Sequence, residues 1–95
     1  MTRTDPTAVR ERVASIVSAV THTPIDPAVH ARRDSLEEWD SLSHVEILFA
    51  IEEDQGVEFG EDVMDRLDSV DAITAEVVRI EDAAADDRSR EETAS

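Results

Sequence analysis

The sequence predicts an all-α fold, a four-helix bundle with a long first loop and a short third helix. Apolar residues recur at the three- and four-residue spacing of helices in three separate segments. The 95 residues include two glycines and three prolines, fewer than the many turns of an all-β domain need. Aromatic residues are scarce, so aliphatic side chains must form the core of a chain whose length indicates one small domain.

The first helix is expected from about Pro6 to Val20. Thr4 or Asp5 can cap it, because side-chain oxygens of Thr and Asp accept hydrogen bonds from the free N–H groups at a helix start. Proline fits the first helical position, where its missing N–H is not needed. One face of this segment carries an apolar stripe of Val9, Val13, Ile16, Val17 and Val20.

A long connection extends over residues 21–40, and Pro24 and Pro27 interrupt it. A connection of this length is unusual in a compact domain unless it wraps around the core. Its apolar residues are therefore expected to point inward as anchors; they are Ile25, Val29, Leu36 and Trp39.

Three further helices complete the predicted bundle. The second begins near Ser41 and ends near Gly56, since glycine readily adopts the left-handed conformation that ends many helices. A brief third helix is expected over 61–67. Asp68 or Ser69 can cap the fourth, whose inward stripe is Val70, Ile73, Val77 and Ile80.

The domain is expected to cover residues 1–81. From Asp82 the chain becomes rich in Ala, Asp, Glu and Arg and loses its apolar stripe. A segment of this composition buries too little apolar surface to offset the entropy of ordering. Residues 82–95 are therefore predicted to be a disordered acidic tail.

The second helix has two apolar faces. Its expected core face carries His44, Ile47, Leu48, Ile51 and Gln55. A buried histidine or glutamine would need a hydrogen-bond partner, so His44 and Gln55 are both expected at the edge of the core. The nearly opposite face carries Leu42, Val45 and Phe49 beside Glu46, Glu52 and Glu53. This second stripe either lies under the long loop or forms an exposed docking surface for another protein.

Charge and cysteine content exclude several classes of function. The net charge is −15, from 24 acidic residues against nine arginines, so phosphate backbones and anionic membranes are repelled. A basic patch on another protein is the natural complement. Without cysteine the chain forms no disulfide or thiolate metal site, and any thiol that it uses must come from a prosthetic group. The sequence shows neither an apolar signal core at its start nor a run of membrane-spanning length, so we expect a cytoplasmic protein.

Ser41 stands at the start of the two-faced helix and has two interpretations. It can cap the helix, as serines often do. It can instead present its hydroxyl to a modifying enzyme at a helix start, where the free N–H groups suit an attached phosphate. The tripeptide Asp34-Ser35-Leu36 repeats the same pattern, but the chain leaves no room for a separate amphipathic helix after Ser35.

The segment from Trp39 to Glu46, read as Trp-Asp-Ser-Leu-Ser-His-Val-Glu, and the next residues Ile-Leu-Phe-Ala-Ile-Glu-Glu resemble the Asp-Ser-Leu motif and recognition helix of acyl carrier proteins. The resemblance continues through Gly56 to Phe59 and from Leu67 to Val70. It spans residues 6–81, with a poor match over 21–35. It implies a right-handed four-helix bundle of the acyl-carrier type.

The resemblance also implies a function. Ser41 would accept 4′-phosphopantetheine from coenzyme A through a phosphopantetheinyl transferase, and Asp40 would help that transferase to hold its magnesium. The chain would be a monomeric, non-catalytic carrier of acyl thioesters in fatty-acid, polyketide or related secondary-metabolite biosynthesis. Its partners would be acyl-loading, condensing or tailoring enzymes with basic patches. They would contact Leu42, Val45, Glu46, Phe49, Glu52 and Glu53.

Three alternatives stay open at this stage. The cargo could be aminoacyl or peptidyl, as in non-ribosomal peptide pathways, because such carriers share the architecture. The chain could instead be a non-catalytic acidic interaction module, which explains the charge but not the position of Ser41. A small metal-binding or hydrolytic protein is disfavoured, since the three histidines lack ligand spacing and Phe59 stands where a calcium loop needs glycine.

Overall fold

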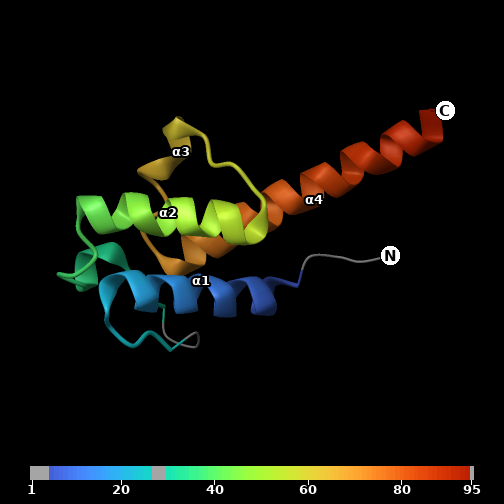
Figure 1. Cartoon of the computed structure of the whole chain (residues 1–95). Helices are drawn as coiled ribbons and strands as arrows, with labels where there is room; N and C mark the ends of the chain where they lie inside the picture. Colours follow the sequence, from blue (N-terminus) through green and yellow to red (C-terminus); the bar gives the residue numbers. More distant parts are fainter. Residues whose placement is uncertain (1–4, 27–29, 95) are drawn as a thin grey trace.

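The computed structural model of the chain describes residues 5–26 and 30–94. These residues form helices joined by loops, as the sequence predicts. Figure 1 shows α1 and α2 lying beside one another, with α4 crossing behind them and extending beyond the bundle. The elements in chain order are α1 (Pro6–Thr21), the short 3₁₀ helix η1 (Arg33–Ser35), α2 (Ser41–Gln55), α3 (Glu61–Met64) and α4 (Val70–Ala94).

The first helix, α1, begins and ends close to its expected bounds. The carboxylate of Asp5 accepts a hydrogen bond from the Thr7 amide at 3.0 Å, which satisfies one of the free N–H groups of the first turn. Of the predicted stripe, Val9, Val13 and Val17 are buried, while Ile16 and Val20 pack at the edge of the core. Thr4, the other suggested cap, lies outside the described residues.

The core lies where α1 packs against both α2 and α4. From α2 it receives Ile47, Leu48 and Ile51, and from α4 the fully buried Val70, Ile73 and Val77. Gly56 ends α2 with a φ of 66°, a left-handed conformation that glycine adopts without strain. The predicted apolar periodicity of these helices is therefore confirmed.

The long loop wraps the core through its apolar anchors. Trp39 is only 2% exposed, and Ile25 and Leu36 pack half-buried against the core. Val29, the fourth expected anchor, lies outside the described residues. The loop is also fixed by its backbone, because the Arg33 amide donates to the Asp68 carbonyl at 2.7 Å and the Val70 amide donates to the Ala31 carbonyl at 3.0 Å.

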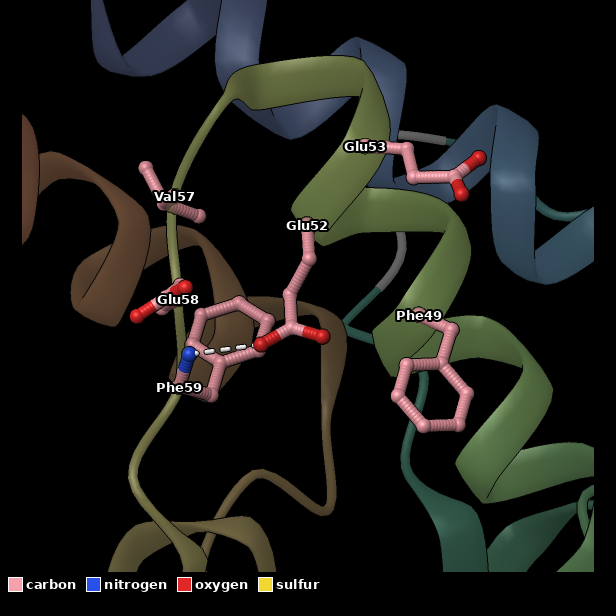
Figure 2. A pocket seen from close by; sticks show the side chains of 6 residues that line it. All are labelled: Phe49, Glu52, Glu53, Val57, Glu58 and Phe59. Carbon is pink, nitrogen blue, oxygen red and sulfur yellow. Dashed lines mark hydrogen bonds between the residues drawn. The ribbon is translucent and has the colours of Figure 1, made fainter.

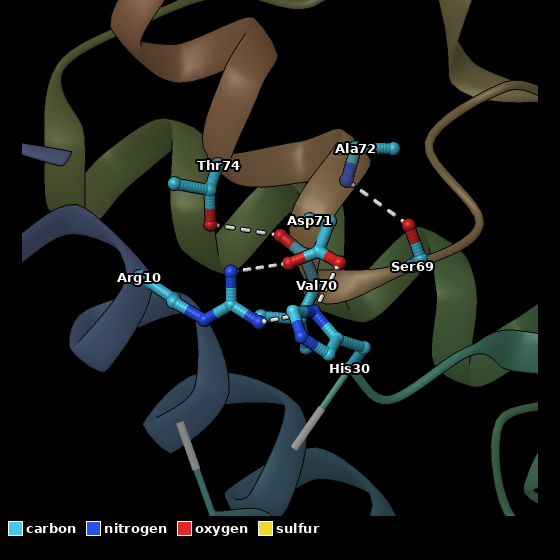
Figure 3. Close-up of polar contacts among 7 residues, drawn as sticks. All are labelled: Arg10, His30, Ser69, Val70, Asp71, Ala72 and Thr74. Carbon is cyan, nitrogen blue, oxygen red and sulfur yellow. Dashed lines mark hydrogen bonds and ion pairs between the residues drawn. The ribbon is translucent and has the colours of Figure 1, made fainter. Parts of the chain in front are cut away.

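A polar cluster ties the same loop to α1 and α4 (Figure 3). Arg10 of α1 forms an ion pair with Asp71 in the first turn of α4, and the ring of His30 in the loop is hydrogen-bonded to the same carboxylate. Burial raises the pKa of the Asp71 carboxyl, but the His30 hydrogen bond and the Arg10 charge outweigh it, so this pKa lies below its ordinary value. The carboxylate therefore joins three segments that are distant in sequence.

The last two helices differ in length from the sequence prediction. The third was expected to reach Leu67, but α3 stops at Met64, where the chain tightens into successive i→i+3 hydrogen bonds. The fourth begins as expected, since the Ser69 hydroxyl accepts from the Ala72 amide at 3.0 Å. It then continues to Ala94 through residues 82–94, which were predicted to belong to a disordered tail; the alanines, arginines and glutamates among them have high intrinsic helix propensity.

Within the described part of the chain, we find no helix that combines the length and the apolar content needed to traverse a bilayer.

Candidate functional site

Ser41 is the first residue of α2, and its side chain is exposed. It is not the helix cap. The cap is Asp40, whose carboxylate accepts a hydrogen bond from the Ser43 amide at 2.8 Å. The capping interpretation of Ser41 is therefore wrong, and its hydroxyl is free for another role. The Ser41 Oγ instead accepts a hydrogen bond from the guanidinium of Arg33 at 3.2 Å.

Asp40 keeps a negative charge beside that hydroxyl. Hydrogen bonds from the amide and the hydroxyl of Ser43 hold the pKa of the Asp40 carboxyl below its ordinary value, because they stabilise the ionised form. The residue is exposed, so its remaining lone pairs face solvent. An ionised, accessible carboxylate one residue before Ser41 can contact a cation that another protein brings.

Exposure alone does not separate Ser41 from Ser35, because both side chains are exposed. The two serines differ in the structure on their C-terminal side. Ser35 ends the three-residue η1, and the next residue, Leu36, turns into the edge of the core. Ser41 begins the 15 residues of α2. Only the second serine stands at the start of a helix that could present a recognition surface.

The second apolar face of α2 is exposed to solvent. The exposed fractions are 69% for Leu42, 47% for Val45 and 58% for Phe49. The alternative in which the long loop covers Phe49 is therefore wrong. Glu46 and Glu53, also exposed, flank these apolar side chains. An apolar stripe with an acidic rim, starting next to Ser41, is the arrangement that fits a basic protein partner.

Glu52 differs from the other acidic residues of this face. Its Oε2 accepts a hydrogen bond from the Phe59 amide at 2.8 Å, which joins α2 to the loop after it (Figure 2). The side chain is half-buried rather than exposed. Glu52 therefore stabilises the fold in addition to contributing negative charge to this face. An open pocket of about 420 Å³ lies beside it, lined by Phe49, Glu52, Glu53, Val57, Glu58 and Phe59.

Sequence reasoning placed His44 at the edge of the core, but it is only 6% exposed. Both ring nitrogens have partners: Nδ1 accepts from the Trp39 indole at 3.0 Å, and Nε2 lies 2.9 Å from the Met64 carbonyl. These bonds connect the residue before Asp40, the first turn of α2 and the end of α3. His44 and Trp39 thus fix the local structure that presents Ser41.

Arg33 was missed at the sequence level. It lies in the loop region where the resemblance is poor, eight residues before Ser41, and no local spacing connects the two. Its proximity depends on the backbone pairing of the loop with the residues before α4, which no sequence pattern indicates.

Within the described residues, no group of three or more His, Asp or Glu side chains is arranged to hold a metal ion. Comparison of the chain with models of protein families, with curated proteins and with solved structures finds no match in any of the three.

Proposed function

We propose that this chain is an acyl carrier protein that holds a 4′-phosphopantetheine arm on Ser41. One observation carries the proposal. An exposed serine hydroxyl, free of capping, stands directly at the start of a helix whose outward face is an exposed apolar stripe with an acidic rim. A carrier needs an accessible attachment atom and a surface by which its partner enzymes recognise it. In this chain the Ser41 hydroxyl lies next to the exposed face of α2, which would be that surface.

The residues around Ser41 fit an attached phosphodiester. The hydroxyl is exposed, so a transferase can reach it, and the adjacent guanidinium of Arg33 offers donors suited to phosphate oxygens. Asp40, ionised and exposed, would contact the magnesium of the transferase. The arm, when attached, would supply a thiol that forms a thioester with the carboxyl group of the cargo.

The attachment step uses the chain only as a nucleophile. Ser41 Oγ would form a bond to the phosphorus that bears pantetheine in coenzyme A, and adenosine 3′,5′-bisphosphate would leave. The hydroxyl proton would pass to a base on the transferase. Because the Ser41 oxygen accepts its hydrogen bond from Arg33, its own proton remains available for this transfer.

The outward face of α2 would then serve recognition. Leu42, next to the attachment residue, and Phe49, two turns further along, supply apolar contacts. Glu46 and Glu53 would orient basic patches of partner enzymes toward the arm. Such a contact is small and partly polar, which suits a shuttle that must dissociate after each delivery.

The test is the intact mass of the chain after incubation with coenzyme A and a transferase of broad specificity. The wild type and Ser35→Ala should gain one phosphopantetheine mass, while Ser41→Ala should fold normally and gain none. A wild type that stays unmodified with a transferase that loads a known carrier would overturn the proposal. A gain of mass by Ser41→Ala would show that the arm is attached to a residue other than Ser41.

The exposed apolar stripe also favours a second candidate, a non-catalytic acidic interaction module. Such a module would bind partners through the same face of α2 and would remain unmodified in the mass experiment. Among carriers, aminoacyl or peptidyl cargo stays an alternative to acyl cargo, and adenylating enzymes that load an amino acid onto the holo chain would reveal it.

A further inference from the structure

We infer that Arg33 holds the phosphodiester on Ser41 and so sets the direction in which the arm leaves the bundle. This inference rests on the proposed function, because it concerns the group attached at Ser41. It goes beyond that function by assigning a positioning role to a residue of the long first loop.

The first observation is a direct contact. The Arg33 Nη2 atom donates to Ser41 Oγ at 3.2 Å. In a phosphodiester the phosphorus is bonded to this same Oγ, so the non-bridging oxygens lie one bond beyond the phosphorus, close to the atom that the guanidinium already contacts. The flexible arginine side chain can follow them by a small rotation, and its planar fork can bind two phosphate oxygens together.

The second observation is that Arg33 is available. Four other arginines are committed to carboxylates: Arg10 with Asp71, Arg12 with Asp54, Arg32 with Asp34 and Arg79 with Glu76. Among the residues that the structure describes, Arg33 forms no such ion pair, although the chain is strongly acidic. Its guanidinium is held instead by a neutral hydroxyl, a weaker partner than an anion.

The third observation is that the backbone of Arg33 is fixed. Its amide donates to the Asp68 carbonyl at 2.7 Å, and the neighbouring Arg32 pairs with Ser69 as an isolated bridge. The side chain is half-buried, in contrast to the exposed Arg32 beside it. The loop thus presents one arginine to Ser41 from a fixed backbone position. Because the Arg33 side chain is already half-buried, it has less rotamer freedom to lose when the guanidinium binds phosphate.

The inference is tested by ³¹P NMR on the full chain after loading with coenzyme A. Wild type, Arg33→Gln, Arg33→Lys and the matched control Arg32→Gln are compared with each holo chain unfolded in urea, which supplies the resonance position of a free arm. In wild type and Arg32→Gln the phosphodiester resonance should be displaced from that position and broadened. In Arg33→Gln it should narrow and move toward the unfolded position, and Arg33→Lys should lie between.

Salt provides a second measurement, and its wild-type part does not depend on any variant folding correctly. Rising salt should move the wild-type resonance toward the free position, because phosphate and guanidinium are screened from one another, and should leave Arg33→Gln almost unchanged. Far-UV circular dichroism checks the fold, which should persist because the Arg33 amide bond is independent of its side chain.

The possible failures are distinguishable. If wild type gains no phosphopantetheine mass, the proposed function fails and the inference with it. If wild type loads normally but its ³¹P resonance matches those of Arg33→Gln and the unfolded chain, only the inference is overturned. Equal displacement of the resonance in wild type and Arg33→Gln also overturns it, because another group would then hold the phosphate.

Discussion

The indole N–H of Trp39 donates a hydrogen bond to Nδ1 of His44, at 3.0 Å and inside the core. An acceptor at Nδ1 requires the ring proton of the neutral imidazole to be on Nε2, which can then donate to the Met64 carbonyl 2.9 Å away. The two rings lie with their centroids 6.1 Å apart. The most buried aromatic side chain of the chain is thereby joined to the first turn of α2.

Replacing His44 with Leu should lower the free energy of unfolding substantially. The change leaves two buried polar groups, the Trp39 N–H and the Met64 carbonyl, without their present partner, and each such group costs about 1–3 kcal/mol. Urea unfolding followed by far-UV circular dichroism measures the loss, because the helices give this signal in every variant. Surface charges do not contribute to this loss of stability, so the loss should persist at high salt.

The Trp39→Phe background supplies the control for this prediction. There the indole N–H is absent, so the additional cost of His44→Leu should be smaller than in wild type, and a double-mutant cycle gives the difference as a coupling energy. Strictly additive effects of the two changes would contradict a hydrogen bond between the two rings.

Acid should weaken the cluster of Arg10, His30 and Asp71. The pKa of Asp71 is lower in the folded chain than its ordinary value, so the ionised carboxylate stabilises the fold. This contribution is complete above the ordinary aspartate pKa, about 3.9, and is lost as the pH falls through the lower folded value. The melting temperature of Asp71→Asn should therefore lie below that of wild type at neutral pH and converge with it in acid.

The exposed Asp65 serves as the matched position, since Asp65→Asn removes the same charge outside the cluster. Its melting temperature should follow the wild-type curve across the same pH range. A gap between wild type and Asp71→Asn that stays constant into strong acid would show that the carboxylate charge is not what stabilises the cluster.

Much of this fold could be predicted from local patterns. The spacing of Val9, Val13 and Val17 predicts a buried helix face, and the proline, aspartate and glycine positions predict the helix ends, because both depend only on neighbours in sequence. The sequence pattern also indicated the second apolar face of α2. It did not indicate whether the long loop covers that face, because this depends on where the loop runs in space.

The contacts that sequence could not predict are those between distant segments. The Arg33–Ser41 hydrogen bond and the Glu52–Phe59 bond each need the loops to be in their folded positions. His44 fell on the core face by periodicity, yet its burial depends on Trp39 and on the end of α3, both of which contact its ring. The helix beyond Asp82 depends on the intrinsic helix propensity of its residues. The sequence prediction gave more weight to the missing apolar stripe and therefore expected disorder.

Glu52 and Glu53 are neighbours in sequence and should respond differently to truncation. Glu52→Ala removes the acceptor of the half-buried Phe59 amide, which should cost about 1–2 kcal/mol of unfolding free energy. Glu53 is exposed, so Glu53→Ala should change that quantity by less than about 0.5 kcal/mol. Chemical unfolding of both variants measures the difference. Equal free energies of unfolding for the two variants would mean that water replaces the Glu52 carboxylate as the acceptor for the Phe59 amide without cost.

The two apolar faces of α2 should separate folding from recognition. Ile47 is fully buried, so Ile47→Ala should lower the free energy of unfolding by about 2–5 kcal/mol through lost burial and the cavity left behind. Phe49 is 58% exposed on the opposite face, and Phe49→Ala should change stability by less than about 1 kcal/mol. Its effect should appear instead as slower loading by the transferase, measured as the rate of mass gain.

If Phe49→Ala destabilised the chain as much as Ile47→Ala, the outward face would be part of the core, and a docking role for it could not stand. If it left both stability and loading unchanged, the transferase would not contact this part of α2, and recognition would be confined to the side chains nearer Ser41.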